Sequence, residues 1–419
     1  MKTTDLPNLR HLRAVALVAR YHSVNGAADM LRLSQPAVSL AIRQVEERCG
    51  STLFNRYKTG TYPTPAAEAL VNRIDRCFNE LGRGIVGRGE AREDTADLKY
   101  RLSFAQIATV AALFDLLDWP AAAAQLEISP QSVKRTLRSL ELLLGSAILM
   151  SLPSGVVFTD QGKRVARAAK LAIREIQIGM EEVAQIRGEF SGTLRIGAMP
   201  LPRAQMVPEA LTRLIDIYPA LHIHVREGSH EYLLDLLRNG DIDMMVGALR
   251  GTESVPEISE TLLMRCHLSV IAREGHPLQG KSDLTLADTS ACQWIVNTPG
   301  SPSRTLFDEA FTTRGLPLPE RLLEIGTLGV IRGLLMRGDQ LTMLSRHQVQ
   351  FEEEVGKLAV LDIDLPETER PIGVSTRIGW QPSRPQSEFM RQLELACAAA
   401  PEHDTNALRL VHSSGATST

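Results

Sequence analysis

The sequence contains no apolar run close to the roughly 20 residues that a membrane-spanning helix requires, which excludes a protein built on such helices. Behind its first charges, the stretch MKTTDLPNLRHLR has no apolar segment, so we expect no secretory signal. The five cysteines form neither CxxC pairs nor a regular framework, a pattern typical of the reducing cytoplasm. Nucleophile elbows, Walker loops and HExxH motifs are absent too. We therefore expect a cytoplasmic protein that is not an enzyme, makes no membrane contact and holds no metal or cofactor.

Charge is unevenly spread along the chain. Residues 1–96 carry 14 Lys and Arg against 10 Asp and Glu, whereas residues 191–419 carry 21 against 29. A basic front and an acidic body suit a nucleic-acid-binding head on a larger domain, because neutralising phosphates needs local cations.

The most informative feature that is present is an ungapped repeat. Residues 9–70 recur 95 positions later, and the likeness extends through the turns. Identical pairs include Val15/Val110, Ala28/Ala123, Ser34/Ser129, Val38/Val133, Arg43/Arg138, Glu46/Glu141, Gly50/Gly145 and Thr64/Thr159. A constant offset over a whole motif indicates a duplicated domain.

In the first copy, the spacing predicts a helix–turn–helix followed by a wing. Ser34 caps a helix over residues 36–48, whose apolar positions recur at helical spacing, and Gly50 ends it. Residues 58–60 form the tip of a hairpin.

The outward face of this helix suits DNA. Gln35 and Ser39 are candidates for base edges, because Gln can pair bidentately with adenine. We expect Ser34 and Arg43 to hold phosphate, and the wing cations to reach the backbone or the minor groove. The candidate DNA-binding residues are Ser34, Gln35, Pro36, Ser39, Arg43, Arg56 and Lys58.

The second copy has diverged. Its wing has Ser151 and Pro153 where the first has Arg56 and Lys58, and its third helix ends in three leucines. Cations nevertheless remain on the outward face of that helix, so two roles stay open: an auxiliary DNA contact, or dimerisation or spacing. The candidates for auxiliary DNA contact are Ser129, Gln131, Lys134, Arg135 and Arg138.

A long helix is predicted behind each copy. In the second, apolar residues from Val165 to Ile186 keep a 3.5-residue period, which is typical of a coiled-coil partner. We expect this seam to mediate self-association, the alternative being packing onto its own domain. From Gly192 onward, short apolar runs alternate with amphipathic helices, a rhythm that predicts a parallel sheet flanked by helices.

At SQPAVSLAIRQVEERCGSTLFNR (Ser34–Arg56), followed by a domain opening GTLRIG, the chain resembles the LysR-type transcriptional regulators. Further family-like phrases are NGDIDMMVG, GHPL and FTDQG. The resemblance implies a DNA-binding head joined by a helix to two periplasmic-binding-protein-like subdomains, assembled as a homodimer or homotetramer that meets RNA polymerase at the promoter. Two departures stand out: the family carries one winged head and this chain two, and Ala67 replaces the Gly that the family has after the wing.

The expected fold is multi-domain, with two winged helix–turn–helix domains and an α/β effector domain of two subdomains. The expected boundaries are 7–66 for the first head, 67–96 for a linker helix and flexible linker, 97–161 for the second head, 162–190 for a linker or dimerisation helix, 191–399 for the effector domain and 400–419 for a disordered tail.

The effector is expected between the subdomains, at strand ends and helix N-termini. Residues 297–304 combine hydroxyls, a helix start and one guanidinium, which suits a small organic acid or a phosphorylated metabolite; an ordinary capping loop is the alternative. The candidate effector-binding residues are Met199, Pro200, Ser229, Thr298, Ser301, Ser303, Arg304 and Thr327.

These features predict a transcriptional regulator that binds double-stranded DNA and responds to a small, anionic effector. The alternative is a small-molecule-binding interaction protein whose heads serve assembly rather than DNA binding.

Overall fold

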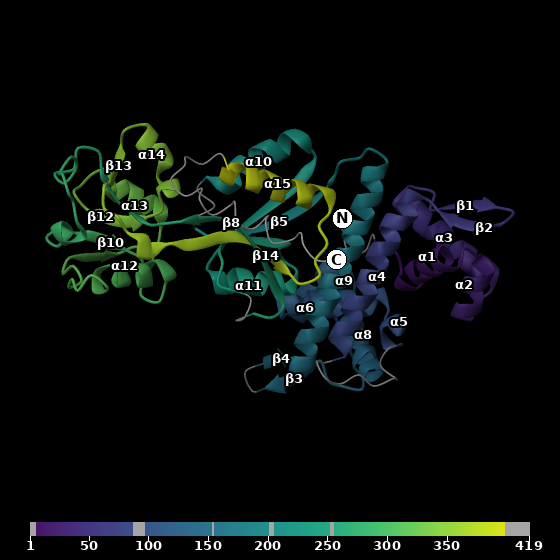
Figure 1. Cartoon of the computed structure of the whole chain (residues 1–419). Helices are drawn as coiled ribbons and strands as arrows, with labels where there is room; N and C mark the ends of the chain where they lie inside the picture. The colour runs from purple at the N-terminus through teal and green to yellow at the C-terminus, as the bar shows by residue number, and fades with distance from the viewer. Residues whose placement is uncertain (1–5, 87–96, 153–154, 201–204, 252–254, 399–419) are drawn as a thin grey trace, which may run out of the picture. The chain divides into compact units, whose positions relative to one another are not determined.

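A computed structural model describes residues 6–86, 97–152, 155–200, 205–251 and 255–398 (Figure 1). The chain forms two compact units. Unit 1 comprises residues 1–194 with 218–223 and 238–241, and unit 2 comprises residues 195–217, 224–237 and 242–419. The expected flexible linker and the expected tail lie largely or wholly outside the described residues. No helix in the described ranges is long and apolar enough to cross a membrane.

Unit 1 opens with three helices, a hairpin and a long helix. Their bounds are α1 (Leu9–Tyr21), α2 (Val24–Leu31), α3 (Gln35–Cys49), β1 (Phe54–Tyr57), β2 (Gly60–Pro63) and α4 (Pro65–Ile85). Ser34 caps α3 by accepting a hydrogen bond from the backbone of Ala37, and Gly50 ends it with φ 62°, a left-handed conformation that costs a glycine little. The side chain of Glu46 accepts from the backbone of Leu53 at 2.8 Å and so fixes the turn into the hairpin.

A short helix, α5 (Leu98–Arg101), precedes a second series with the same order of elements. Their bounds are α6 (Phe104–Leu116), α7 (Trp119–Gln125), α8 (Pro130–Leu144), β3 (Leu149–Leu152), β4 (Gly155–Phe158) and α9 (Asp160–Ile186). Each begins 95 residues after its counterpart. The local contacts recur as well: Ser129 caps α8, and the Glu141 side chain accepts from the backbone of Ile148 at 2.9 Å.

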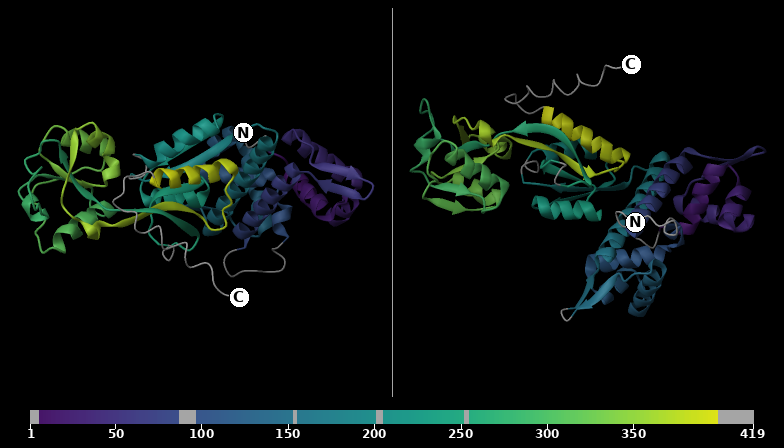
Figure 2. Two further views of the ribbon diagram at one scale, coloured as in Figure 1. Left: turned by 45° about the horizontal axis from the view of Figure 1, so that its top comes forward. Right: turned by 60° about the horizontal axis from the view of Figure 1, so that its bottom comes forward.

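The two long helices, α4 and α9, pack against each other in opposite directions. A Cβ atom on Gly84 would lie 2.3 Å from that of Ala168, and one on Gly179 would lie 3.0 Å from that of Arg73. Because the late residues of each helix meet early residues of the other, the pair is antiparallel. Figure 2 shows the two helices side by side, with one set of short helices toward each end.

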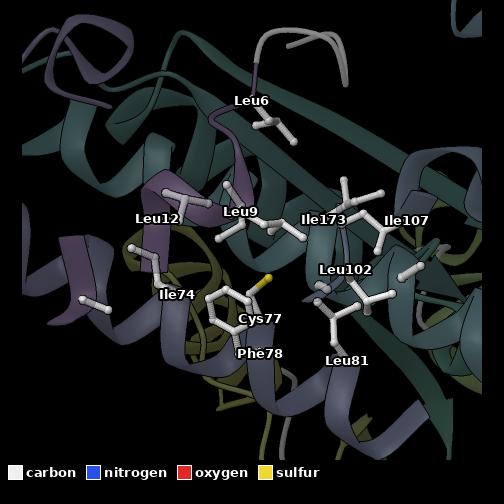
Figure 3. Packing of buried hydrophobic residues seen from close by; sticks show 14 of the residues in the cluster. Leu6, Leu9, Leu12, Ile74, Cys77, Phe78, Leu81, Leu102, Ile107 and Ile173 are labelled. Carbon is white, nitrogen blue, oxygen red and sulfur yellow. The ribbon is translucent and has the colours of Figure 1, made fainter. Parts of the chain in front are cut away.

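This packing corrects the expectation that the seam in α9 faces a second chain. Val165, Ala169, Ala172, Ile176 and Val183 are all buried within the single chain. They belong to one apolar cluster that also takes in α1, α4 and α6 (Figure 3). A 3.5-residue period of apolar residues indicates that a helix packs along another helix. For α9 this other helix is α4 of the same chain.

Unit 2 is built on two five-stranded sheets. The first has the order β6-β5-β7-β14-β8, and the second β11-β10-β12-β9-β13. The strands of the first sheet are β5 (Gly192–Ala198), β6 (Leu221–Glu227), β7 (Met244–Ala248), β8 (Ile258–Cys266) and β14 (Arg370–Arg377). Those of the second are β9 (Ser269–Arg273), β10 (Trp294–Val296), β11 (Leu322–Glu324), β12 (Leu341–Leu344) and β13 (Leu358–Leu361).

Both sheets are mixed, which corrects the expected parallel sheet. β5 pairs with β7, and β10 with β11 and β12, in parallel. In contrast, β14 runs antiparallel to β7 and β8, and β9 antiparallel to β12 and β13. The chain passes from the first sheet to the second between β8 and β9 and returns in β14, so the first lobe combines two separated segments of the sequence and the second lobe is one continuous segment.

Helices cover the sheets of unit 2. They are α10 (Met206–Ile217), α11 (His230–Asn239), α12 (Pro302–Thr312), α13 (Leu328–Leu335), α14 (Gln350–Glu354) and α15 (Arg384–Ala398). The second lobe packs around Trp294, whose ring meets Phe307 and Phe311 edge-on at 5.2 and 5.7 Å between centroids. Among the described residues, no group of three or more His, Cys, Asp and Glu side chains is placed to hold a metal ion.

Candidate DNA interface and ligand pocket

The outward face of α3 is open to solvent. Val38, Ile42 and Val45 are buried against the rest of the head, so the residues between them must point outward. Ser34, Gln35, Pro36 and Arg43 are exposed, and Ser39 is half-buried. The structure thus brings the predicted recognition residues together on one helix face.

The wing is held by backbone and aromatic contacts. The backbone of Thr61 in β2 donates to the carbonyl of His22 at 2.9 Å, just past α1. The rings of His22 and Tyr62 stack with centroids 5.0 Å apart. Arg56, in β1, and Lys58, in the turn that follows β1, are both exposed. Tyr57 between them is 63% exposed and was missed by the sequence reasoning, although an aromatic residue among wing cations signals a surface contact.

No ion pair or side-chain hydrogen bond within the described residues engages Arg43, Arg56 or Lys58. Their charges are therefore available to a ligand from outside. Exposed cations on a recognition helix and on a wing are the groups that contact DNA phosphates in winged helix–turn–helix proteins.

On α8, the corresponding face is also open. Ser129, Gln131, Lys134, Arg135 and Arg138 are exposed around the buried Val133 and Leu137. The ammonium of Lys134 lies 5.6 Å from the ring centroid of Trp119 at the start of α7. At the other end of this helix, Leu142 is 84% exposed.

A cavity of about 480 Å³ lies in unit 2 between its two sheets. Its wall contains residues from loops that follow strands of both lobes. Predicted residues in the lining are Met199, Pro200, Ser229, Thr298, Ser301 and Ser303. These residues line one cavity although between 69 and 104 positions separate the first three from the last three.

Arg304 and Thr327 are not in the lining. The guanidinium of Arg304 donates to Asp308 at 2.9 Å and to Glu324 at 3.2 Å, and these bonds raise its pKa. Its charge is thus neutralised by two carboxylates beside the cavity. Ser301 caps α12 by accepting from the backbone of Arg304, so the loop works as a helix cap as well as a wall. Contact of Arg304 with the ligand is therefore not supported by the lining of this cavity.

Other cationic and polar side chains line the cavity instead. Arg250, Arg370, His230 and Gln348 contribute, and none was singled out from the sequence. The buried Nε of Arg370 has no hydrogen-bond partner in the described part of the chain. Arg250 pairs with Glu231 at 2.7 Å, which helps to lower the pKa of that carboxyl, after the backbone hydrogen bond that lowers it most. No local pattern marks these arginines, because each stands alone in the sequence near a strand end.

A winged helix–turn–helix with available cations and, on the same chain, a two-lobed α/β unit with a central cavity define a class: DNA-binding proteins that carry a small-molecule sensor. Comparison with known proteins supports this assignment. Residues 9–68 match the model of the bacterial regulatory helix–turn–helix protein, lysR family, and residues 187–398 match the LysR substrate binding domain.

Curated relatives and solved structures agree. The HTH-type transcriptional regulator GalR of Pseudomonas putida is 30% identical over 379 residues, which cover 90% of this chain and 94% of that protein. PcaQ of Agrobacterium fabrum is 24% identical over 275 residues, covering 66% and 88%. A full-length OxyR variant of Pseudomonas aeruginosa aligns with TM-score 0.53 at 17% identity, over 70% of this chain and 94% of its own. LysG of Corynebacterium glutamicum aligns with TM-score 0.51 at 18% identity, over 70% and 97%.

The chain belongs to the LysR family of transcriptional regulators. It is a DNA-binding regulator with an N-terminal helix–turn–helix and an effector-binding domain of two α/β subdomains. The relatives are transcriptional regulators, which favours this function over that of an interaction protein whose heads serve assembly.

Proposed function

We propose that this regulator reads DNA with α3 and its wing, and that a small anion bound in the cavity of unit 2 controls that binding. Gln35 and Ser39 contact base edges, Ser34 and Arg43 hold phosphates, and Arg56 and Lys58 follow the backbone beside the wing. The exposure of these side chains on one face supports the assignment.

Residues 97–161 form a second, divergent winged helix–turn–helix head, and residues 162–190 its linker helix. The recurrence of every element and of the Glu141 contact at an offset of 95 supports this part of the proposal. GalR of Pseudomonas putida matches 90% of the chain, so its alignment must include part of this segment, which makes up more than a tenth of the sequence. The first head spans residues 7–66, its linker 67–96 and the effector domain 191–399.

The observation that carries the ligand class is Arg370. This cationic side chain lines the cavity, and its Nε has no hydrogen-bond partner in the described part of the chain, so the hydrogen-bonding capacity of the guanidinium is not fully used within the protein. Hydroxyls of Ser229 and Ser301 and the imidazole of His230 line the same cavity. Its volume of about 480 Å³ suits a small organic acid or a phosphorylated metabolite. Binding between two lobes favours one arrangement of them over others, and this difference is what alters DNA binding and the encounter with RNA polymerase.

Calorimetry of the full chain against a panel of carboxylates and sugar phosphates tests the ligand class. Arg370→Ala should weaken binding at least tenfold, because it removes the charge that faces the cavity. Arg304→Ala is the matched control: that guanidinium is held by Asp308 and Glu324, so affinity should change less than twofold. Binding of neutral ligands only, or equal loss in both variants, would contradict the proposal.

The protein acts as a cytoplasmic homodimer or homotetramer. Because the seam of α9 is buried within the chain, assembly uses another surface than that seam.

A further inference from the structure

The contacts between α4 and α9 come in equivalent pairs: each contact has a counterpart in which both residues are replaced by their equivalents in the other copy of the repeat. Gly84 packs against Val165 and Ala168, and Gly179 packs against Leu70 and Arg73. Gly179 stands 95 residues after Gly84, and the residues that each glycine meets are related by the same 95 residues. Exchanging the two copies therefore maps one contact onto the other. This is the defining property of an isologous, two-fold contact, here made between two segments of one chain.

The buried charged residues of α4 differ from those of α9, so the pair is not equivalent to a pair of two identical helices. Arg73, with 3% of its side chain exposed, donates to Glu182 and to Glu175, and Arg76 donates to Glu175 at 2.9 Å. The first copy thus supplies the arginines and the second copy the carboxylates. The counterparts of Arg73 and Arg76 in the second copy are Ala168 and Leu171.

Two α9 helices in the same register would consequently leave Glu175 buried without its arginines. An uncompensated buried charge is strongly unfavourable, so this arrangement is selected against. The buried ion pairs therefore disfavour a pair of two second-copy helices, whereas the first copy has a carboxylate, Glu80, at the position equivalent to Glu175.

Each helix of the pair follows its own head, so the antiparallel pairing relates the two heads by the same approximate two-fold axis. Figure 2 shows the two sets of short helices and hairpins toward opposite ends of the paired helices. The outward faces of their third helices differ in chemistry. Pro36 and Ser39 of α3 correspond to Gln131 and Lys134 of α8, whereas Arg43 corresponds to another arginine, Arg138.

We infer that one chain carries both halves of a two-fold DNA-reading unit, and that it binds a duplex with two unequal half-sites in inverted orientation. The first head reads one half and the second head reads the other. This inference rests on the proposed DNA-reading role of the heads. Two-fold proteins read inverted half-sites, and unequal recognition helices must prefer unequal halves. The outward face of α8 carries three exposed cations, Lys134, Arg135 and Arg138, where that of α3 carries Arg43, so the half read by the second head depends more on phosphate contacts and is the less sequence-specific one.

Site selection tests the inference. The full chain is equilibrated with a library of random duplexes, and bound duplexes are sequenced. The selection is repeated with Gln35→Ala, with Lys134→Ala combined with Arg138→Ala, and with Lys163→Ala, which removes an exposed cation outside both recognition helices. We expect two inverted, unequal half-sites. Gln35→Ala should relax the sequence of the stronger half alone, the double variant should lower protection and enrichment of the weaker half several-fold, and Lys163→Ala should change neither.

Two results would overturn the inference while leaving the DNA-reading role of the first head intact. One is a symmetric inverted repeat in which Gln35→Ala relaxes both halves equally, since two first heads would then read it. The other is a single half-site that the double variant leaves unchanged. No enrichment by the unmodified chain would instead contradict the proposed DNA reading, and the inference with it.

Discussion

Arg73 is a charged residue in the middle of an apolar interface, and its environment explains how it stays ionised. Burial alone would lower its pKa, but hydrogen bonds to Glu182 and Glu175 and the charges of these carboxylates raise it. Removing the arginine would leave Glu182 partly buried without this cation, and would leave Glu175 with Arg76 in place of two arginines.

Arg73→Ala should therefore lower the free energy of unfolding by about 3–5 kcal/mol. Arg83→Ala on the same helix is the control. Its side chain is 66% exposed and, among the residues that the structure describes, pairs with Glu80 alone, so its loss should cost about 0–1 kcal/mol. Urea unfolding of the full chain, followed by circular dichroism, measures both. Equal effects would show that the buried pairs do not hold α4 to α9.

Two buried thiols make the stability of the fold depend on pH. Burial raises the pKa of Cys49 from its ordinary value of 9.0 to about 12, and burial raises that of Cys77 as well. Since the folded-state pKa is raised, the contribution to stability is present below pH 9 and is lost as the pH rises toward 12. At pH 8, iodoacetamide should label both cysteines far more slowly in the native chain than in urea, as peptide mass spectrometry would record. Rapid native labelling would mean that the helix interface opens readily.

At the scale of elements, glycines set how closely the paired helices approach. Gly84→Ala would place a methyl group 2.3 Å from the Cβ of Ala168 and 3.1 Å from the carbonyl oxygen of Arg164. We expect a loss of about 1–3 kcal/mol in stability, because neither neighbour is a flexible side-chain end. Gly82→Ala, two residues earlier, meets only the flexible end of Lys99 and should be neutral or stabilising by up to about 1 kcal/mol. Thermal unfolding compares them, and a more harmful Gly82→Ala would refute this packing.

The elements that the sequence predicted well are those with local signals. The caps Ser34 and Ser129 and the terminating Gly50 and Gly145 act within a few residues, so the third helix of each copy begins and ends close to the predicted residues. The partner of the α9 seam was predicted wrongly, since the period of a seam carries no information about which helix faces it. No local pattern indicated β8, β11 or β13, because these strands lie at sheet edges and pair with strands from other parts of the sequence.

The two candidate sites also differ in whether local sequence signals predict them. The recognition face of α3 follows from helical periodicity alone, whereas the cavity collects single residues from many strand ends. Arg304 was chosen because it lies in a polar loop, yet its local carboxylates neutralise it. Arg370 opens β14, more than 60 residues later, and only the return of the chain to the first sheet brings it to the cavity.

At the scale of the whole molecule, the proposed DNA reading and the proposed ligand binding belong to separate units of the chain. Unit 1 carries the DNA-reading surfaces and the helix pair that relates them, and unit 2 carries the ligand cavity. The acidic balance of residues 191–419 gives no long-range attraction for an anion, so the ligand depends on local groups such as Arg370. Affinity in the micromolar range is the expected consequence.

The central claim is that α3 and its wing read DNA. The most direct measurement is a gel-shift titration of the full chain on the DNA upstream of its own gene, repeated over a range of salt concentrations, with Gln35→Ala and Arg43→Ala beside the unmodified protein. Gln35→Ala should cost about 1–3 kcal/mol of discrimination at one base pair. Arg43→Ala should weaken binding to all sequences and reduce the slope of log affinity against log salt by about 0.9, the value for one phosphate contact. Unchanged affinity, specificity and salt slope in both variants would contradict the account.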